Sequence, residues 1–150
     1  GMTGEQWDRV LDVSLNGFFN VTQPLTMPMM RTRWGRIVSV SSVAAVAGNR
    51  GQVNYAAAKG ALHAASKSLA LELARRGVTV NVVAPGLIAT DINKGKIPED
   101  KRAAILDSIP LGCIGEPNDV AGCVVFLASD LSKYCTGITL DVNGGMLIHG

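Results

Sequence analysis

The chain has 150 residues, of which 47% are hydrophobic and 17% charged, with a formal net charge of +2. This composition suits one globular domain or part of one, and the small charge without a basic, aromatic-rich run argues against nucleic-acid binding. No apolar run reaches the roughly 18 residues that a membrane-spanning helix needs, so we expect no membrane partner.

Residues 4–31 are predicted to form a long helix, because apolar residues recur every three or four positions along one face. Thr3 is a suitable N-cap residue for this helix. Pro24 and Pro28 conflict with a straight helix, since each removes a backbone donor and crowds the preceding turn. We therefore expect a kink near residues 20–24, or a break.

Residues 36–41 are nearly all apolar or small, which is typical of a parallel strand buried on both faces. Residues 43–53 are small and contain glycine, and they are predicted to form a loop. A helix is expected from about Asn54 to about Arg76, with Gly77 as its C-terminal stop.

Four further elements are expected, two strands and two helices. They are a strand at 78–83, a helix near 99–108, a helix at about 117–129 that begins with a proline, and a last strand at 137–142. Residues 87–98 carry Gly, Lys and Pro and are predicted to form a mobile flap. Strands that alternate with helices predict right-handed crossovers and a parallel sheet.

Tyr55 and Lys59 stand four residues apart, which places them on one face of the predicted helix, one turn apart. An ammonium group beside a phenol favours the phenolate, and such a pair can exchange a proton with a carbonyl oxygen. Ser42, thirteen residues before the tyrosine, offers a hydroxyl that can hydrogen-bond the same oxygen. Taken alone, these residues also fit a packed tyrosine and a serine at the end of a strand.

Three other segments accompany this pair. Gly35-Arg36-Ile37-Val38-Ser39-Val40-Ser41-Ser42 is predicted to be a strand that ends in hydroxyls, Asn81-Val82-Val83-Ala84-Pro85-Gly86 a strand that ends in a turn, and Val142-Asn143-Gly144-Gly145 follows the last strand. Together these motifs resemble the short-chain dehydrogenase/reductase family over essentially the whole chain. Within the family, the chain is most similar to bacterial reductases of 3-oxoacyl thioesters on acyl carrier protein.

The resemblance implies an α/β fold with a doubly wound, Rossmann-like parallel sheet. It also implies that Tyr55 is the catalytic acid/base, that Lys59 supports it and binds the nicotinamide ribose, and that Ser42 orients the substrate carbonyl. Ser41 matches less well, because its spacing to the tyrosine differs by one. The family usually has an Asn for proton relay where this chain has Ser14, which lacks an amide. Asn16 and Asn20 stand two and six residues away from that position, and neither is a direct substitute.

The resemblance also implies a nicotinamide cofactor, NADP, with NAD not excluded. Pro85 and Gly86 begin the segment expected at its nicotinamide end, where the Ile88 backbone would meet the carboxamide and the Thr90 hydroxyl the pyrophosphate. A plain strand-ending turn is the structural alternative. Ligands of open parallel sheets bind beyond the carboxyl ends of the strands, which is where this segment falls.

The implied substrate is an acyl-carrier-protein thioester, and Arg33 and Arg76 stand where the carrier reductases have basic residues that dock the acidic carrier. Arg76 also suits the C-terminal end of a helix, where a cation is favourable, and Arg33 also suits a solvated loop. We expect His63 and His149 to have structural roles.

The chain has three cysteines without paired spacing, so we expect no disulfide framework and no metal site. With no visible signal peptide, a cytoplasmic location is expected.

The chain matches only the C-terminal part of the family domain, since no Gly-rich dinucleotide-binding turn follows a strand. We expect a single partial domain that binds a dinucleotide poorly alone. Two other interpretations stay open: a short-chain dehydrogenase that acts on another small carbonyl or alcohol, and a non-catalytic module that keeps the elements through which relatives form dimers or tetramers.

Overall fold

Three parallel strands form the centre of the fold in a computed structural model, which describes residues 1–91 and 99–148. They lie in the order β1 (Gly35–Val40), β2 (Val78–Pro85) and β3 (Thr139–Val142). β2 is the central strand, and its first seven residues are all buried, as expected for a strand that is covered on both faces. The predicted parallel α/β sheet is confirmed.

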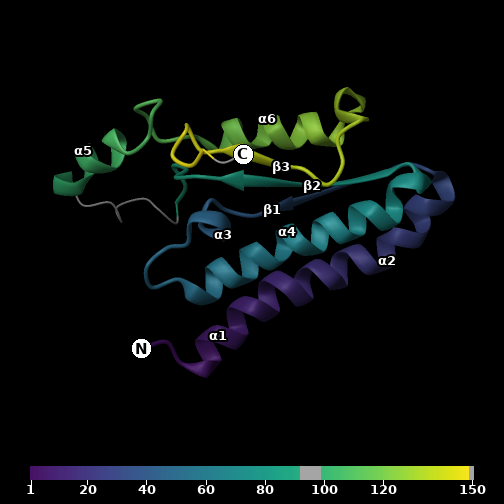
Figure 1. Ribbon diagram of the computed structural model, residues 1–150, viewed down its shortest axis with the longest axis horizontal. Helices are drawn as coiled ribbons and strands as arrows, with labels where there is room; N and C mark the ends of the chain where they lie inside the picture. The colour runs from purple at the N-terminus through teal and green to yellow at the C-terminus, as the bar shows by residue number, and fades with distance from the viewer. Residues whose placement is uncertain (92–98, 149–150) are drawn as a thin grey trace.

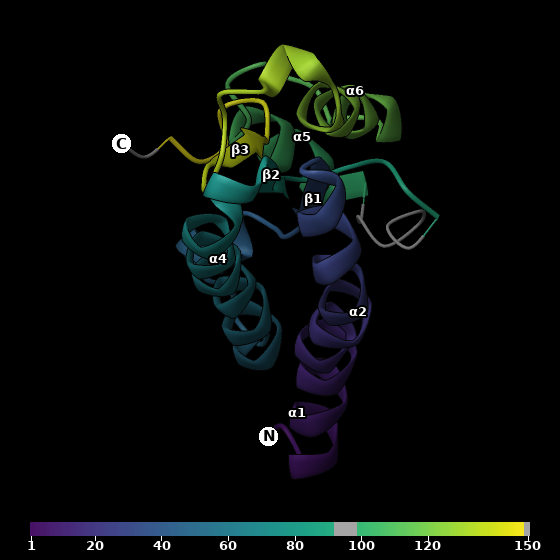
Figure 2. The ribbon, with the colours of Figure 1, turned by 90° about the vertical axis from the view of Figure 1, so that its right-hand side faces the viewer.

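Helices cover both faces of this sheet, so that the described part of the chain has three layers (Figures 1 and 2). α2 and α4 lie on one face and α6 on the other, and α4 connects β1 to β2 while α6 precedes β3. No helix in the described ranges is long and apolar enough to cross a bilayer. The helical elements are α1 (Gly4–Leu11), η1 (Asp12–Asn16, a π-helix), α2 (Gly17–Thr32), α3 (Ala44–Ala47), α4 (Val53–Leu73), η2 (Ala74–Arg76), α5 (Glu99–Asp107), α6 (Pro117–Ala128) and η3 (Asp130–Ser132).

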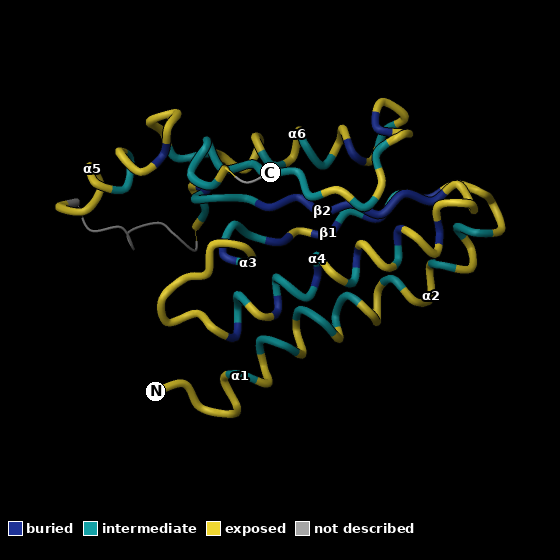
Figure 3. Tube along the Cα trace, viewed as in Figure 1, coloured by how far each residue is buried: buried dark blue, intermediate teal, exposed yellow. Residues whose placement is uncertain are grey.

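The hydrophobic core lies between the sheet and the helices α2 and α4. Ile37 of β1 and Val80 of β2 pack there with Ala70 and Leu73 of α4, and all four are at most 9% exposed. Figure 3 shows the same pattern, with the dark buried segments concentrated in the strands and on the sheet-facing side of α4. This packing holds the carboxyl ends of the strands in fixed positions relative to the first turns of α4.

The first predicted helix is divided differently from the prediction. Thr3 caps α1 as expected, and a π-helical segment, Asp12–Asn16, separates α1 from α2. α2 continues through Pro24 and Pro28. Both prolines are exposed, so solvent can satisfy the carbonyl groups that lose a donor there, and the expected break is wrong.

Two further differences concern the loops. The predicted loop 43–53 contains the single-turn helix α3. The predicted flap begins with an anchored residue, because Ile88 is buried and pairs with Gly115 in an isolated parallel bridge. Residues 92–98 of that flap lie outside the described residues. Gly77 ends the helical stretch in a left-handed conformation with φ 73°, as the sequence predicts.

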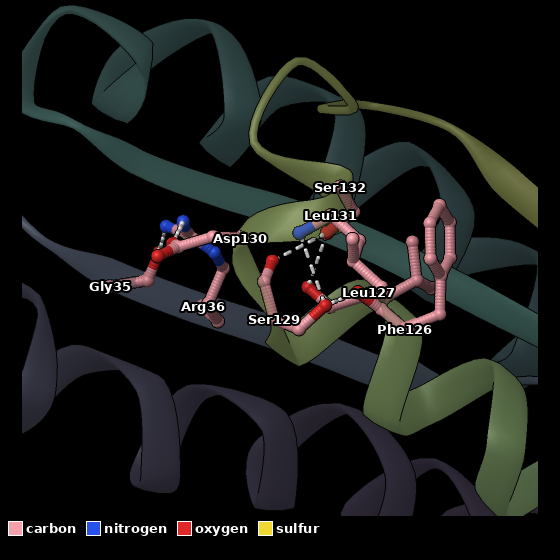
Figure 4. A network of polar contacts seen from close by, with 8 residues as sticks. All are labelled: Gly35, Arg36, Phe126, Leu127, Ser129, Asp130, Leu131 and Ser132. Carbon is pink, nitrogen blue, oxygen red and sulfur yellow. Dashed lines mark hydrogen bonds and ion pairs between the residues drawn. The ribbon is translucent and has the colours of Figure 1, made fainter.

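An ion pair ties the amino end of β1 to the far end of α6 (Figure 4). The Arg36 side chain is 8% exposed, and its Nη2 lies 3.1 Å from Oδ1 of Asp130 in η3. Its Nη1 donates to the Gly35 carbonyl oxygen at 2.9 Å. Ser132 stabilises the same corner by donating its hydroxyl toward the Leu127 carbonyl oxygen at 3.0 Å. These contacts fix β1 against the outer helix at the end opposite Ser42.

Candidate active site

The carboxyl edge of the sheet brings together the two segments that the sequence singled out. The chain leaves β1 through Ser41 and Ser42, and it leaves β2 through Pro85 and Gly86. The Ser41 amide donates to the Val83 carbonyl oxygen at 2.8 Å, and the Val43 amide donates to the Pro85 carbonyl oxygen at 3.0 Å. These bonds hold the strand-end serines directly beside the turn after β2.

Lys59 links the second turn of α4 to the end of β1. Its Nζ donates to the Val40 carbonyl oxygen at 2.8 Å and lies 5.7 Å from the centre of the Tyr55 ring. Burial lowers the pKa of Lys59 from its ordinary value of 10.5, because the charged form loses solvation. An ammonium group has three donors, so two hydrogens remain for other acceptors after the bond to Val40.

The two strand-end serines differ in their surroundings. Ser41 is 4% exposed, and its hydroxyl contacts the Lys59 main-chain carbonyl oxygen at 3.1 Å and His63 Nε2 at 2.7 Å. Ser42 is half-buried, and its Oγ accepts from the Ala44 amide at 3.2 Å. A hydroxyl used as an acceptor still has its own hydrogen to donate, which favours Ser42 over Ser41 as the donor to a substrate oxygen.

Asn54 braces the start of α4, and sequence reasoning gave it no role. Its Oδ1 accepts from the Tyr55 amide at 2.8 Å, and its Nδ2 donates to the Gln6 carbonyl oxygen of α1 at 3.0 Å. The side chain thus caps the helix locally and holds α1 beside it. An Asn at a helix start is the available sequence signal, although its partner lies 48 residues away.

The segment after β2 is held closely against the end of β3. The Gly86 amide donates to the Val142 carbonyl oxygen at 2.9 Å, and a Cβ added at Gly86 would come within 2.9 Å of the Asn143 Cα. In the bridge at Ile88, the bonds to Gly115 use the carbonyl of Leu87 and the amide of Ala89. The amide and carbonyl of Ile88 itself therefore point to the other side of the extended segment. Thr90 is half-buried and follows two residues later.

Ser14 lies in the π-helical segment and faces the same hollow as Lys59. Both residues line a cavity of about 450 Å³ between α2, the edge of β1 and α4. The Gly17 amide is shared between the carbonyl oxygens of Asp12 and Ser14, so the regular helical bonding is interrupted at the position where the resemblance implies an Asn. Asn16 is exposed, and its Nδ2 bonds Asp12 Oδ1 at 2.6 Å. It therefore does not replace the missing amide.

Arg33 and Arg76 lie near each other but at the opposite edge of the sheet. Arg33 Nη2 is 3.5 Å from the Arg75 carbonyl oxygen, and Gly77 contacts the Arg33 backbone. Both turns stand at the amino ends of strands, whereas Ser42 follows β1 and Lys59, one turn after Tyr55, bonds the Val40 carbonyl oxygen at the carboxyl end of that strand. At about 3.3 Å per residue, the six residues of β1 put roughly 20 Å between the two groups.

No group of three or more His, Cys, Asp or Glu side chains that could hold a metal ion occurs in the part of the chain that the structure describes. The three cysteines, Cys113, Cys123 and Cys135, are free thiols. His63 contacts Ser41 as described above, and His149 lies outside the described residues.

Known proteins match nearly the whole chain. A family described as enoyl-(acyl carrier protein) reductase matches residues 1–147. The 3-oxoacyl-[acyl-carrier-protein] reductase FabG of Aggregatibacter actinomycetemcomitans is 51% identical over 146 residues, which are 97% of this chain and 59% of the relative. FabG of Rickettsia felis is 48% identical over 98% of this chain and 61% of its own length. Nodulation protein G of Azospirillum brasilense is 48% identical over 97% of this chain and 58% of its own length. The chain thus spans about three fifths of the length of these relatives.

Proposed function

Because the chain belongs to the short-chain dehydrogenase/reductase family, we propose that it forms the catalytic portion of an NADPH-dependent 3-oxoacyl-[acyl-carrier-protein] reductase. The reaction converts the 3-keto group of an acyl thioester into a 3-hydroxyl group. The relatives named FabG support this substrate class. The family description names an enoyl reductase, which saturates a carbon–carbon double bond, whereas the FabG relatives are named 3-oxoacyl reductases. Assays with both kinds of substrate distinguish the two reactions.

The residues at the carboxyl edge fit the nicotinamide half of the cofactor. Two ammonium hydrogens of Lys59 remain after its bond to Val40, the Ile88 backbone groups face away from the Gly115 bridge, and Thr90 supplies a hydroxyl. When bound, the reduced nicotinamide supplies the hydride that the keto carbon accepts. Lys59, Ile88 and Thr90 are the residues proposed to hold it.

Tyr55, Ser42 and Lys59 are proposed to have separate roles in the proton transfer. The Tyr55 phenol donates its proton to the keto oxygen as negative charge develops there, and the Ser42 hydroxyl donates a hydrogen bond to the same oxygen. The Lys59 ammonium stabilises the phenolate that is left. Solvent then returns a proton to the phenolate, with Ser14 on the wall of the same cavity as Lys59 as the proposed contact for that water.

The observation that carries this proposal is the position of the Lys59 ammonium between the Val40 carbonyl and the Tyr55 ring. Tyr55→Phe keeps the ring and removes the proton, so the rate of NADPH oxidation with an acetoacetyl thioester should fall by about 10²- to 10⁴-fold. Tyr134→Phe is the matched control, because Tyr134 is fully exposed. Equal rates for the two variants would contradict the proposal.

Parallel assays with a 2-enoyl thioester and a simple ketone identify the substrate class. Faster turnover of the ketone than of the thioester would favour a dehydrogenase for another small carbonyl, and turnover of the enoyl thioester would favour the enoyl reductase.

We also propose that the reaction is cytoplasmic, which the three free thiols support, because reducing compartments keep thiols unpaired.

The part of the relatives that lies beyond the matched segment is proposed to supply the remaining cofactor contacts. The matched region covers 59–61% of the FabG relatives named above, and no Gly-rich turn of the dinucleotide-binding kind follows a strand in this chain. Fluorescence titration of NADPH against the 150 residues should therefore show only weak binding. Tight binding, at about micromolar Kd, would show that these residues suffice.

A homo-oligomer is proposed from the apolar side chains that α2 exposes. Phe19 is 60% exposed, Val21 63% and Leu25 47%, and exposed apolar surface can contact a second copy of the chain. Sedimentation of the chain and of a Phe19→Ser variant tests this, because the proposal expects association only with Phe19. If the chain associates but neither binds NADPH nor reduces a carbonyl when joined to the remaining family domain, the non-catalytic module becomes the better reading.

A further inference from the structure

His63 lies one helical turn after Lys59 on α4 and contacts the end of β1 through Ser41. The distance from His63 Nε2 to Ser41 Oγ is 2.7 Å, and Ser41 Oγ lies 3.1 Å from the main-chain carbonyl oxygen of Lys59. Ser41 is 4% exposed. Its hydroxyl therefore depends on these two groups and not on bulk solvent for its hydrogen bonds.

The contact from Ser41 to the Lys59 carbonyl allows one consistent direction for both hydrogen bonds. A serine hydroxyl carries a single hydrogen, and a carbonyl oxygen can only accept. When Ser41 donates that hydrogen to the Lys59 carbonyl, His63 must donate its Nε2 hydrogen to Ser41. The result is a continuous chain of donors from the His63 ring through Ser41 to the backbone of Lys59.

We propose that His63 is a positioning residue that, through Ser41, fixes the strand end carrying Ser42 against the helical turn carrying Lys59. This inference rests on the proposed function, in which Ser42 and Lys59 meet the same substrate and cofactor. His63 itself touches neither. It acts on the junction between β1 and α4, where Lys59 Nζ also bonds the Val40 carbonyl oxygen at 2.8 Å.

The effect of His63 follows from the geometry of a hydroxyl bonded on two sides. With both partners present, Ser41 Oγ has one position, and the bonds strengthen each other in a site with little solvent. Without the ring donor, Ser41 can rotate away from Lys59, and the strand end then keeps only the bond from Lys59 Nζ to Val40 among its three bonds to α4. Donors to a developing oxyanion must lie within about 2.7–3.1 Å of it, so a small displacement of Ser42 lowers the rate.

The bonding itself is tested by nitrogen NMR of the histidine ring in the 150-residue chain. We expect His63 as the Nε2–H tautomer with slow exchange of that hydrogen, and we expect Ser41→Ala to abolish the slow exchange. A ring protonated only on Nδ1 would overturn the proposal, because Ser41 would then donate to His63 and not to Lys59.

Positioning is tested separately by the ammonium signal of Lys59, which depends on its bond to Val40 and not on catalysis. His63→Leu removes the donor and keeps similar bulk, whereas His63→Gln keeps an N–H donor of similar reach. The Lys59 Nζ signal should be broadened in His63→Leu by faster exchange and retained in His63→Gln. An unchanged signal in His63→Leu would overturn the positioning role, and this readout decides it even if the protein reduces no 3-oxoacyl thioester.

Kinetics in the active reductase complete the test. His63→Leu should lower kcat by about tenfold or more with KM for NADPH within about twofold, because misplacement acts on the reacting groups. His63→Gln should restore most of kcat. A kcat for His63→Leu equal to that of the wild type would overturn the proposal. An inactive wild type with an intact Lys59 signal would instead count against the proposed function.

Discussion

Lys59 combines a proposed catalytic role with an environment that disfavours its charge. Its pKa is lowered from 10.5 by burial, so between the lowered folded-state pKa and 10.5 the unfolded chain binds more protons than the folded chain. Stability must therefore rise with pH in that window, and the contribution is constant below it. The bond to Val40 offsets part of the desolvation cost but does not reverse its direction.

Lys59→Met should remove this pH dependence. The free energy of unfolding of the wild type relative to Lys59→Met should increase as the pH rises towards 10.5, because the lysine loses its proton more easily in the folded state. Urea unfolding of both proteins across that range measures the difference. Lys59→Arg, whose guanidinium stays charged throughout, should behave like Lys59→Met in its pH dependence. A difference that falls with pH would contradict the assigned direction.

At position 86, a close contact with Asn143 favours glycine, and the backbone conformation does not require it. A Cβ at this position would lie 2.8 Å from the Asn143 Cβ and 2.9 Å from its Cα, and one of those atoms is backbone that cannot rotate away. Gly86→Ala should lower stability by about 1–3 kcal/mol through overpacking and displace the turn that precedes Ile88. Gly122→Ala is the matched control.

Gly122 lies inside α6, and a Cβ there would meet nothing within 4 Å. Alanine is favoured over glycine in a helix, so Gly122→Ala should raise stability by about 0.5–1 kcal/mol. Thermal unfolding of the two variants gives the comparison. Opposite signs are expected, and two losses of equal size would show that the contact with Asn143 has no special cost.

At the level of elements, the ends of β1 are fixed by different means. Its carboxyl end is held by Ser41 and Lys59 against α4, and its amino end by Arg36 against η3. The Arg36 side chain is 8% exposed while Asp130 is 86% exposed, so the pair has one desolvated and one solvated partner. Removing the carboxylate leaves the buried guanidinium with the Gly35 carbonyl as its remaining hydrogen-bond acceptor.

Asp130→Asn should therefore lower stability by a modest amount, about 0.5–1 kcal/mol at low salt, since an exposed carboxylate is well screened. The loss should shrink at high salt, because screening already weakens the pair in the wild type. Chemical unfolding at two ionic strengths measures both effects. Asp107→Asn, at the end of α5 and without an ion pair among the described residues, controls for the change in net charge. A loss that grows with salt would contradict the ion-pair account.

The elements also show what the sequence can and cannot predict. Strand and helix positions follow from apolar patterning and from Gly77, and the Tyr55–Lys59 spacing follows from helical geometry. The π-helical segment Asp12–Asn16 carries no local signal, and the prolines of α2 are tolerated because they face solvent. The link from His63 to Ser41 spans 22 residues, so it depends on how β1 and α4 pack and cannot be read from either segment alone.

For the whole molecule, the separation between the proposed catalytic residues and the proposed docking arginines matters most. The proposed catalytic residues stand at the carboxyl edge of the sheet, and the arginines of the α2–β1 and α4–β2 turns at the amino edge. The net charge of +2 is too small to attract an acidic partner from all sides. Recognition of an acidic carrier protein would thus depend on where the positive charges gather.

Reversing the charges of Arg33 and Arg76 tests that dependence. The double variant Arg33→Glu, Arg76→Glu should lower kcat/KM for a carrier-linked substrate by about 10-fold or more at low salt, because complementary charge mainly speeds encounter. Turnover of a small thioester should not change, since both side chains are roughly 20 Å from Ser42. The pair Arg9→Glu, Arg50→Glu makes the same change in net charge at exposed positions elsewhere. If that pair weakens the carrier-linked reaction more, the carrier docks at the other end of the molecule.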